Sequence, residues 1–364
     1  MSALLRSAID CQKSDVSAPK QLAIAWQSRA ADFIDCAGQK RGWTGSCGCD
    51  YERLYSFGEG LAADRRNAGG LFVEENINFG VIPAALADEA GGGRHSDGGG
   101  SVMTFEIIDF HTHPFEEPFQ NICAHKDYCD MGAAQTERDM RALGVSRICG
   151  TVLRYFGKIK PACWDDVHQA NVDALKLRGF YGDFYEPGIH VHPDYVAESC
   201  REIEDMAARG VKLVGELVPY GQGWADYSCA GMDKILDCAR AHGMIVSFHS
   251  MGEDEMDRMV EKHKDVVLVA AHPGEYGEFM RHMERMKKSE NYYLDLSGYG
   301  IFRHGMLRHG IDLFGPERFI YGSDFPTCNP AMYLGGVLLD FTITDAEKKL
   351  ILAENAKRLL AGRE

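Results

Sequence analysis

Eight short β-type runs alternate with amphipathic helical stretches between Phe105 and Glu364, and this alternation limits the fold more than any other feature. The runs are FEIIDFH, SRICGTVL, FYGDFYEPGIHV, VKLVGEL, MIVSFH, VVLVAAH, NYYLDLS and RFIYGSD. Helices that separate consecutive strands place those strands parallel to one another in a single sheet. Eight such units over about 260 residues predict an α/β fold, the (β/α)8 TIM barrel.

The first hundred residues have a different character. Hydrophobic periodicity is weak there, and the segment 91–100 (GGGRHSDGGG) contains six glycines, as flexible linkers do. We therefore predict an N-terminal extension over residues 1–102, poorly ordered and largely irregular, which includes this Gly-rich linker. The barrel is predicted over residues 103–364, and the working protein is expected to begin near Met103.

Composition argues against several classes of protein. The chain has 39 Lys and Arg against 54 Asp and Glu, a net charge of −15, whereas nucleic acid binding normally needs a basic surface. No apolar run reaches the roughly 18 residues of a membrane helix, and the first residues lack the apolar core of a secretion signal. The 12 scattered cysteines are typical of reduced thiols. We predict a cytoplasmic protein that binds neither nucleic acid nor membrane.

Titratable residues stand at the ends of several predicted strands, where the reactive groups of such barrels gather. His111 and His113 are two residues apart, so their imidazoles point the same way, and Asp109 stands behind them as an orienting group. A third imidazole from His249 and a carboxylate from Asp324 would complete a metal site that stays open to water. His272 ends the sixth run and Glu216 the fourth.

Five stretches together resemble a known family: IIDFHTHPF (107–115), GELVPYGQG (215–223), HSMGE (249–253), AHPGEYGEF (271–279) with NYYLDLSGYG (291–300), and YGSDFP (321–326). Over roughly residues 105–364 the chain resembles the amidohydrolase superfamily, and more closely its amidohydrolase-2 branch of metal-dependent TIM-barrel hydrolases and decarboxylases. The resemblance implies that one divalent metal ion is held by His111, His113, His249 and Asp324. It implies that His272 acts on the substrate.

The fourth strand departs from the pattern of this branch. Members often carry a Lys in a G-I-K-L-x-P stretch, where this chain has Gly215-Glu216-Leu217-Val218-Pro219. Glu216 is therefore a candidate to bind a second cation, to position the substrate or to form a buried ion pair. The number of metal ions, one or two, stays open at this point.

The predicted function is metal-dependent hydrolysis of an amide, lactone or ester carbonyl by a metal-activated water. Asp324 would take the proton of that water and pass it to the leaving group, and His272 would stabilise the oxyanion. Zinc is the expected ion because it suits His-rich sites, with manganese, iron and cobalt as alternatives. The partner is a small-molecule substrate, and a homodimer is the expected assembly.

Two alternatives stay open. The first is non-oxidative decarboxylation of an aromatic or enoic acid, whose carboxylate would suit Arg154 after the second strand or Arg303 after the seventh. The second is a non-catalytic relative that uses the barrel for binding. The chain has another H-x-H, His190-Val191-His192, in which His192 is a candidate substrate contact and a packed histidine is the more common case.

Overall fold

The computed structural model describes residues 104–124, 132–154, 163–224, 226–300 and 303–362. The predicted N-terminal extension with its Gly-rich linker lies outside these residues. In the part that is described, the chain forms strands and helices in alternation from Ile107 to Ala361.

Eight parallel strands form one sheet in the order β1 to β8, so every strand pairs with its neighbours in sequence. A bridge between Thr112 and Phe325, and a hydrogen bond from the amide of Phe110 to the carbonyl of Tyr321 (3.0 Å), join the last strand to the first. The predicted TIM barrel is therefore confirmed. The strands are β1 (Ile107–Thr112), β2 (Val145–Gly150), β3 (Tyr185–Ile189), β4 (Leu213–Leu217), β5 (Ile245–His249), β6 (Leu268–Ala271), β7 (Tyr292–Asp295) and β8 (Phe319–Ile320).

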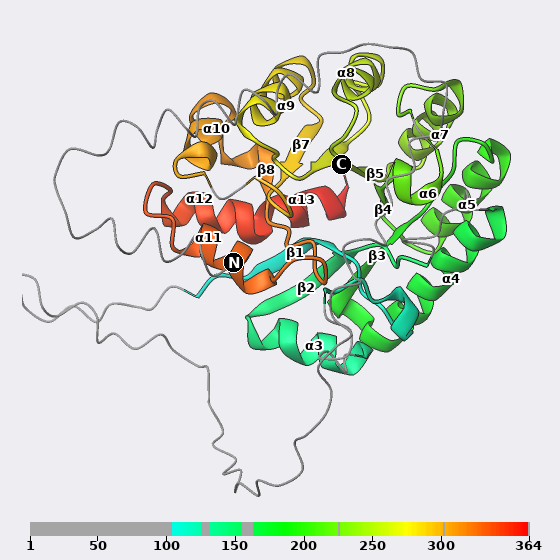
Figure 1. Ribbon diagram of the computed structural model, residues 1–364, viewed down its shortest axis with the longest axis horizontal. Helices are drawn as coiled ribbons and strands as arrows, with labels where there is room; N and C mark the ends of the chain where they lie inside the picture. The colour runs from blue at the N-terminus through cyan, green and yellow to red at the C-terminus, as the bar shows by residue number, and fades with distance from the viewer. Residues whose placement is uncertain (1–103, 125–131, 155–162, 225, 301–302, 363–364) are drawn as a thin grey trace, which may run out of the picture. The chain divides into compact units, whose positions relative to one another are not determined.

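Helices surround the ring of strands, as Figure 1 shows. The longer ones are α3 (Ala133–Ala142), α4 (Trp164–Tyr181), α5 (Val196–Ala208), α7 (Ala230–Ala241), α8 (Glu253–Lys262), α9 (Tyr276–Lys288), α10 (Met306–Phe314), α11 (Pro330–Leu338) and α13 (Asn355–Ala361). The shorter ones are η4 (Pro118–Gln120), η5 (Gly182–Phe184), α6 (Pro219–Gln222), η6 (Pro316–Arg318), α12 (Asp345–Lys349) and η7 (Leu350–Glu354).

Helix α9 illustrates why these stretches become outer helices. The Glu275 side chain accepts a hydrogen bond from the amide of Glu278, and the Glu278 side chain accepts one from the amide of Glu275, so the first turn is capped in both directions. Phe279, Met283 and Met286 recur at helical spacing and are buried against the barrel. The charged residues Glu278, Glu284, Lys287 and Lys288 are exposed to water, whereas Arg285 is buried in ion pairs with Glu253 and Asp257.

Apolar side chains fill the inside of the barrel below the carboxyl ends of the strands. This inner core draws on all strands except β3, with Ile108, Phe110, Cys149, Leu213, Ile245, Val269, Tyr293 and Ile320 as its strand members. Most of these residues lie in the first half of their strand, so the interior is packed at that end. The polar side chains described below stand at the other end of the same strands.

The third unit differs from the sequence prediction in its boundary. The predicted run began at Phe180, but Phe180 and Tyr181 complete α4, and Gly182–Phe184 form η5. Strand β3 begins only at Tyr185. The aromatic residues that suggested an early strand instead belong to a helix end, where Tyr181 and Phe184 pack edge to face.

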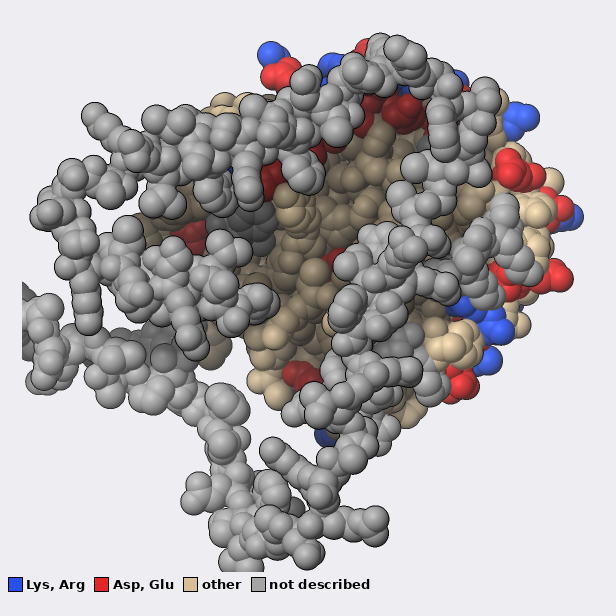
Figure 2. Space-filling model, in the orientation of Figure 1, with Lys and Arg blue, Asp and Glu red and all other residues tan. Residues whose placement is uncertain are grey.

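Most of the outer helices carry exposed charged side chains. Figure 2 shows acidic and basic groups side by side along the edge that α4, α5 and α7 form. Among the helices of the described ranges, none is long and apolar enough to cross a membrane.

Candidate metal centre

Six titratable side chains meet at the carboxyl ends of five strands. They come from the end of β1 (His111, and His113 just after it), from β4 (Glu216), from the last residue of β5 (His249), from the residue after β6 (His272) and from the segment after β8 (Asp324). Five of the six are buried, and the His249 side chain retains 23% exposure. Residues up to 213 positions apart in sequence are thus gathered at one end of the barrel, where barrel enzymes carry their active sites.

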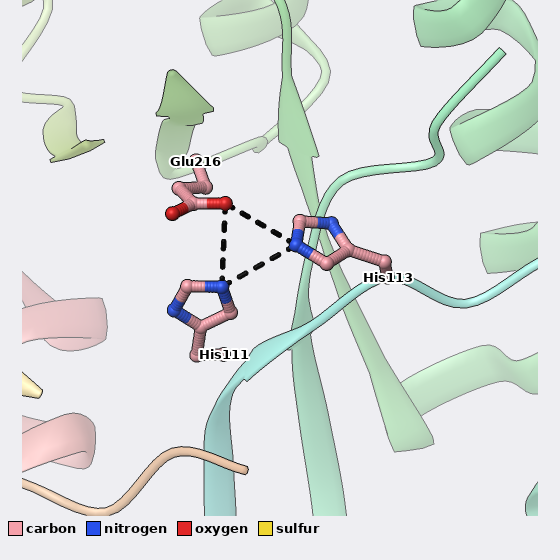
Figure 3. A group of neighbouring side chains, drawn as sticks. All are labelled: His111, His113 and Glu216. Carbon is pink, nitrogen blue, oxygen red and sulfur yellow. Dashed lines mark hydrogen bonds and ion pairs between the residues drawn. The ribbon is translucent and has the colours of Figure 1, made fainter. Parts of the chain in front are cut away.

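The first group consists of His111, His113 and Glu216, which Figure 3 shows as a triangle. The Nε2 atoms of the two imidazoles lie 3.3 Å apart. Glu216 Oε2 lies 3.4 Å from His111 Nε2 and 3.2 Å from His113 Nε2. Three potential ligand atoms therefore face one small space.

Asp324 borders the same space. Its Oδ1 lies 3.8 Å from His111 Nε2 and 3.6 Å from His113 Nε2. The backbone fixes this placement, because the amide of Asp324 donates to the carbonyl of His111 (2.8 Å) and the amide of His113 donates to the carbonyl of Phe325 (2.6 Å). Asp324 has a φ of 60°, a left-handed conformation that costs energy for a residue with a side chain and is concentrated at functional sites.

Asp109 ties the two chain segments together from below. Its Oδ1 accepts hydrogen bonds from the amides of Ser323 (2.9 Å) and His111 (3.3 Å). Burial raises the pKa of this carboxyl to about 7. The Asp109 side chain thus orients the site by holding the backbone of β1 and of Ser323, the residue before Asp324. Strand β1 also shifts its register against β2 between Asp109 and Thr112.

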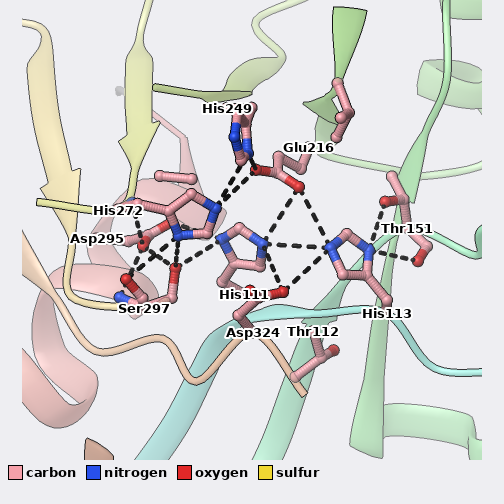
Figure 4. Close-up of polar contacts among 12 residues, drawn as sticks. His111, Thr112, His113, Thr151, Glu216, His249, His272, Asp295, Ser297 and Asp324 are labelled. Carbon is pink, nitrogen blue, oxygen red and sulfur yellow. Dashed lines mark hydrogen bonds and ion pairs between the residues drawn. The ribbon is translucent and has the colours of Figure 1, made fainter. Parts of the chain in front are cut away.

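The second group consists of Glu216, His249 and His272. The other carboxylate oxygen, Glu216 Oε1, lies 3.0 Å from His249 Nδ1 and 3.3 Å from His272 Nε2. These two ring nitrogens are 3.1 Å apart. The predicted ligand His249 is therefore joined to the His111 and His113 pair through Glu216, as Figure 4 shows.

Protein acceptors hold the outer nitrogens of three of these imidazoles. His111 Nδ1 lies 2.9 Å from Asp295 Oδ2, and His113 Nδ1 lies 3.2 Å from the carbonyl oxygen of Thr151. His272 Nδ1 lies 3.2 Å from the carbonyl oxygen of Ser297, whose hydroxyl donates to Asp295. An acceptor behind the ring selects the tautomer whose other nitrogen is a lone-pair donor, which is the usual support of a metal-binding histidine.

Glycine at 298 makes the position of His272 attainable. A Cβ at this residue would lie 2.2 Å from His272 Nδ1, and the φ of Gly298 is +61°. His272 itself has a φ of 69°. Any side chain at 298 would therefore displace the imidazole of His272 from this position.

The electrostatics of the site favour positive charge between the groups. Burial would raise the pKa of Glu216, but the adjacent imidazoles, His111 foremost, hold it well below its usual range. Burial would likewise lower the pKa of His111, but Asp295 and Glu216 raise it well above its usual range. Protons on the imidazoles or a divalent cation can supply that charge.

The donor set suits a metal ion. With metal–nitrogen bonds of about 2.1 Å, the ligand atoms of a tetrahedral ion lie about 3.4 Å apart, close to the spacing in both groups. Imidazole nitrogen and carboxylate oxygen are the ligands of zinc and of related divalent ions. The residues present therefore fit the cofactor that the sequence predicts.

Two residues of this network were not assigned from the sequence. Asp295 is the last residue of β7, and Ser297 follows two positions later with its amide donating to Asp295 Oδ1 (3.0 Å). Both stand in the quoted stretch NYYLDLSGYG. An acidic residue at the end of a barrel strand was the signal that could have identified Asp295.

The two predicted arginines are already paired with carboxylates. Arg154 lies 2.8 Å from Asp173 and its guanidinium stacks over the Phe119 ring at 5.4 Å. Arg303 forms a two-pronged ion pair with Glu275, which also accepts a hydrogen bond from Tyr299. The structure gives neither arginine a contact with the six titratable side chains.

The second H-x-H packs within the barrel wall. His190 Nε2 lies 3.0 Å from the carbonyl oxygen of Val152, and Gln222 Nε2 lies 3.0 Å from His190 Nδ1. The Nε2 atom of His192 lies 3.1 Å from the carbonyl oxygen of Gln222, and its Nδ1 accepts from the amide of Asp194. These contacts suit neutral, structural imidazoles. The predicted substrate contact of His192 stays a prediction.

Acidification is expected to destabilise the protein through His190. Burial lowers the pKa of this imidazole to about 4, whereas an unfolded histidine titrates near 6.5. The unfolded chain therefore binds the extra proton first, and stability falls as the pH drops from about 6.5 towards 4, by about 2 kcal/mol near pH 5. Denaturant unfolding at pH 5 and pH 8 measures the loss. His190→Gln should reduce the loss of stability between pH 8 and pH 5 by about 2 kcal/mol. His168 is half-exposed, so His168→Gln should leave that loss unchanged. Equal pH dependence of stability in the two variants would contradict the role of His190.

Comparison with protein-family models identifies one family that matches this chain. An amidohydrolase family model matches residues 108–361, which include all six titratable side chains. A search of curated protein sequences finds no match.

Solved structures with the same barrel include enzymes of two kinds. A 2,6-dihydroxybenzoate decarboxylase from Rhizobium has a TM-score of 0.56 at 13% identity, covering 71% of this chain and 99% of that chain. A dihydroxybenzoic acid decarboxylase from a Polaromonas species, with manganese and 2-nitroresorcinol bound, has a TM-score of 0.53 at 14% identity, with 71% and 97% covered. A probable 2-pyrone-4,6-dicarboxylic acid hydrolase from Acinetobacter baumannii, with citric acid bound, scores 0.52 at 15% identity, with 70% and 99% covered. At identities of 13% to 15%, these similarities show a shared fold and nothing finer.

Proposed function

Because the chain belongs to the amidohydrolase family, we propose that it is an enzyme which uses a divalent cation to hydrolyse an amide, lactone or ester. One observation carries the proposal: His111, His113 and Asp324, predicted as ligands from distant parts of the sequence, border one space together with Glu216. His249 is the remaining proposed ligand, and its Nδ1 lies 3.0 Å from the other oxygen of Glu216, Oε1. Zinc is the proposed ion, and manganese is the main alternative because a protein of the same fold binds it.

The bound cation would polarise a substrate oxygen and lower the pKa of a nearby water. Asp324 is placed to hold the proton that this water releases. Its Oδ1 faces the imidazoles, and its Oδ2 accepts from the thiol of Cys328 at 3.8 Å, so both oxygens have a fixed direction. A carboxylate held in this way can pass the proton on to the leaving group.

His272 is proposed to stabilise the oxyanion that develops on the carbonyl. Burial would lower the pKa of its imidazole, but the hydrogen bond to Glu216 raises it above its ordinary value. The protonated form can donate a hydrogen bond to a developing negative charge. The open side of the site lies at His249, against whose ring the exposed Tyr220 packs edge to face at 5.4 Å. We propose that the substrate approaches along this side.

Decarboxylation is the second candidate, because two of the barrels with the same fold are named as decarboxylases of dihydroxybenzoic acids. An anionic substrate of that kind would suit an unpaired arginine near the cation. Both predicted arginines are neutralised by carboxylates, Arg154 by Asp173 and Arg303 by Glu275. This pairing favours hydrolysis as the first candidate.

A substrate panel tests the proposal. The full chain loaded with Zn²⁺ or Mn²⁺ is assayed on lactones, amides and esters by proton release, and on aromatic and enoic acids by release of carbon dioxide. We expect hydrolysis that a chelator abolishes and added metal restores. Carbon dioxide release alone would favour the second candidate, and a cation-loaded protein inactive on the whole panel would contradict an enzymatic function.

A further inference from the structure

A chain of polar side chains runs from α9 and β7 to the ends of β5 and β6. Ser250, the residue after β5, donates its hydroxyl proton to the carbonyl of Ala271, the last residue of β6. His282 Nε2 lies 3.4 Å from Ser250 Oγ, and His282 Nδ1 lies 2.7 Å from the hydroxyl oxygen of Tyr292. His282 and Tyr292 are fully buried. None of these side chains has a part in the proposed proton transfer.

The hydroxyl of Ser250 acts where the backbone pairing of β5 with β6 ends. The last paired residues are His249 and Ala271. The next residue, His272, has a φ of 69°, so the chain turns out of the sheet there. Beyond the last backbone pair, Ser250 therefore links the two strand ends that carry His249 and His272.

The direction of these hydrogen bonds follows from the groups that take part. The carbonyl of Ala271 can only accept, so the Ser250 proton points to it and Ser250 Oγ is left to accept from His282. Burial lowers the pKa of His282 to about 3, so its imidazole is neutral and has one N–H. That N–H lies on Nε2, and Nδ1 accepts from the hydroxyl of Tyr292.

A buried arginine polarises the chain of side chains from its other end. Arg285 is fully buried, and Glu253 and Asp257 hold its guanidinium. Its positive charge acts on the hydroxyl of Tyr292 and favours the arrangement in which the oxygen faces the guanidinium and the proton points to His282. The successive protons thus all point towards β6, and hydrogen bonds aligned in this way strengthen one another.

We infer that Ser250 and His282 are positioning residues for His272. They fix the carbonyl of Ala271 and with it the backbone that carries the His272 imidazole, whose Nε2 lies 3.1 Å from His249 Nδ1. His282 also forms a hydrogen bond with the backbone of His272 itself. The inference rests on the proposed function, in which His272 stabilises the oxyanion.

Nuclear magnetic resonance of the full chain, labelled with ¹⁵N-histidine, tests the inference without substrate or metal. The ¹⁵N shifts of an imidazole distinguish its two neutral tautomers and the protonated ring. We expect His282 to be the neutral Nε2–H tautomer between about pH 5 and pH 8, with its signals assigned from His282→Gln and Tyr292→Phe. Ser250→Ala should shift the ring signals of His272, and Ser250→Thr, which keeps the hydroxyl, should restore them.

Kinetics of the Zn²⁺-loaded chain, on a substrate from the panel above, add a second measurement. Ser250→Ala should lower kcat about 10-fold and leave KM nearly unchanged, because a displaced His272 stabilises the oxyanion less well. Ser146→Ala is the matched control, since the Ser146 hydroxyl likewise donates to a carbonyl of the neighbouring strand, that of Ile107 (2.8 Å), at the opposite end of the barrel. This control should keep the wild-type kcat and the wild-type signals of His272.

Each outcome has a separate meaning. An Nδ1–H tautomer or a protonated ring at His282 would overturn the chain of hydrogen bonds. Unchanged His272 signals or an unchanged kcat in Ser250→Ala, or equal effects in Ser146→Ala, would overturn the positioning role. A wild-type chain without turnover would overturn the proposed function, and the His272 signals would still decide the inference. If circular dichroism shows that Ser250→Ala has lost its fold, the His282 tautomer of the wild type and the His272 signals of Tyr292→Phe decide.

Discussion

Asp324→Asn is expected to lower kcat about 10³-fold while the protein still binds metal. Positioned proton transfer contributes roughly 10² to 10⁴ to an enzymatic rate, and an amide cannot hold the proton that the carboxylate takes. The amide oxygen can still face His111 and His113, where Asp324 Oδ1 now lies at 3.8 and 3.6 Å. Steady-state kinetics at saturating metal, together with metal analysis, measures both effects.

Asp312→Asn is the matched control for this substitution. Asp312 lies on α10, 62% exposed and paired with Arg308, and its replacement should leave kcat unchanged. Turnover of Asp324→Asn near that of the wild type would refute the role of Asp324 in proton transfer. Restoration of full turnover by excess metal would show that the residue acts only as a ligand.

Asp295→Asn is expected to weaken metal binding about 10- to 100-fold and to leave kcat at saturating metal largely intact. The buried carboxylate holds His111 Nδ1 at 2.9 Å and so directs the Nε2 lone pair inward. Burial would raise the pKa of Asp295, but the charge of His111 lowers it below its usual value, so Asp295 faces His111 as an anion. An amide supplies neither the charge nor a fixed acceptor.

Competition with a chelating dye measures the metal dissociation constant of this variant. Asp312→Asn serves again as the control and should bind metal as the wild type does. An unchanged dissociation constant in Asp295→Asn would contradict the idea that this carboxylate orients the ligand. Excess metal should restore the turnover of Asp295→Asn but not that of Asp324→Asn, so the two variants separate metal binding from proton transfer.

The fold could be predicted because its signals are local. Each strand is a short apolar run and each helix a stretch with one apolar face, so eight units are visible one after another in the sequence. Strand ends then identified the histidines and Asp324 as neighbours, because parallel strands in a barrel present their carboxyl ends on one face. The boundary of β3 was wrong because the aromatic residues from Phe180 to Phe184 suit a helix end as well as a strand.

The division of the site between the two oxygens of Glu216 could not be predicted. The alternation of side chains along a strand predicts which face of the sheet the Glu216 carboxylate lies on, but it does not say which of its oxygens faces which imidazole. The partners of His190 and His192 come from Val152, Asp194 and Gln222, whose contacts depend on tertiary packing. The N-terminal extension over residues 1–102, the cytoplasmic location and the homodimer stay predictions.

The central claim is that His111, His113, Glu216 and Asp324 surround a cation. Anomalous X-ray diffraction at the zinc absorption edge, from crystals of the active protein loaded with Zn²⁺, tests this claim most directly. We expect an anomalous peak within about 2.2 Å of His111 Nε2, His113 Nε2 and Glu216 Oε2, with Asp324 at its edge. Crystals of active protein with no peak between these side chains would contradict the account.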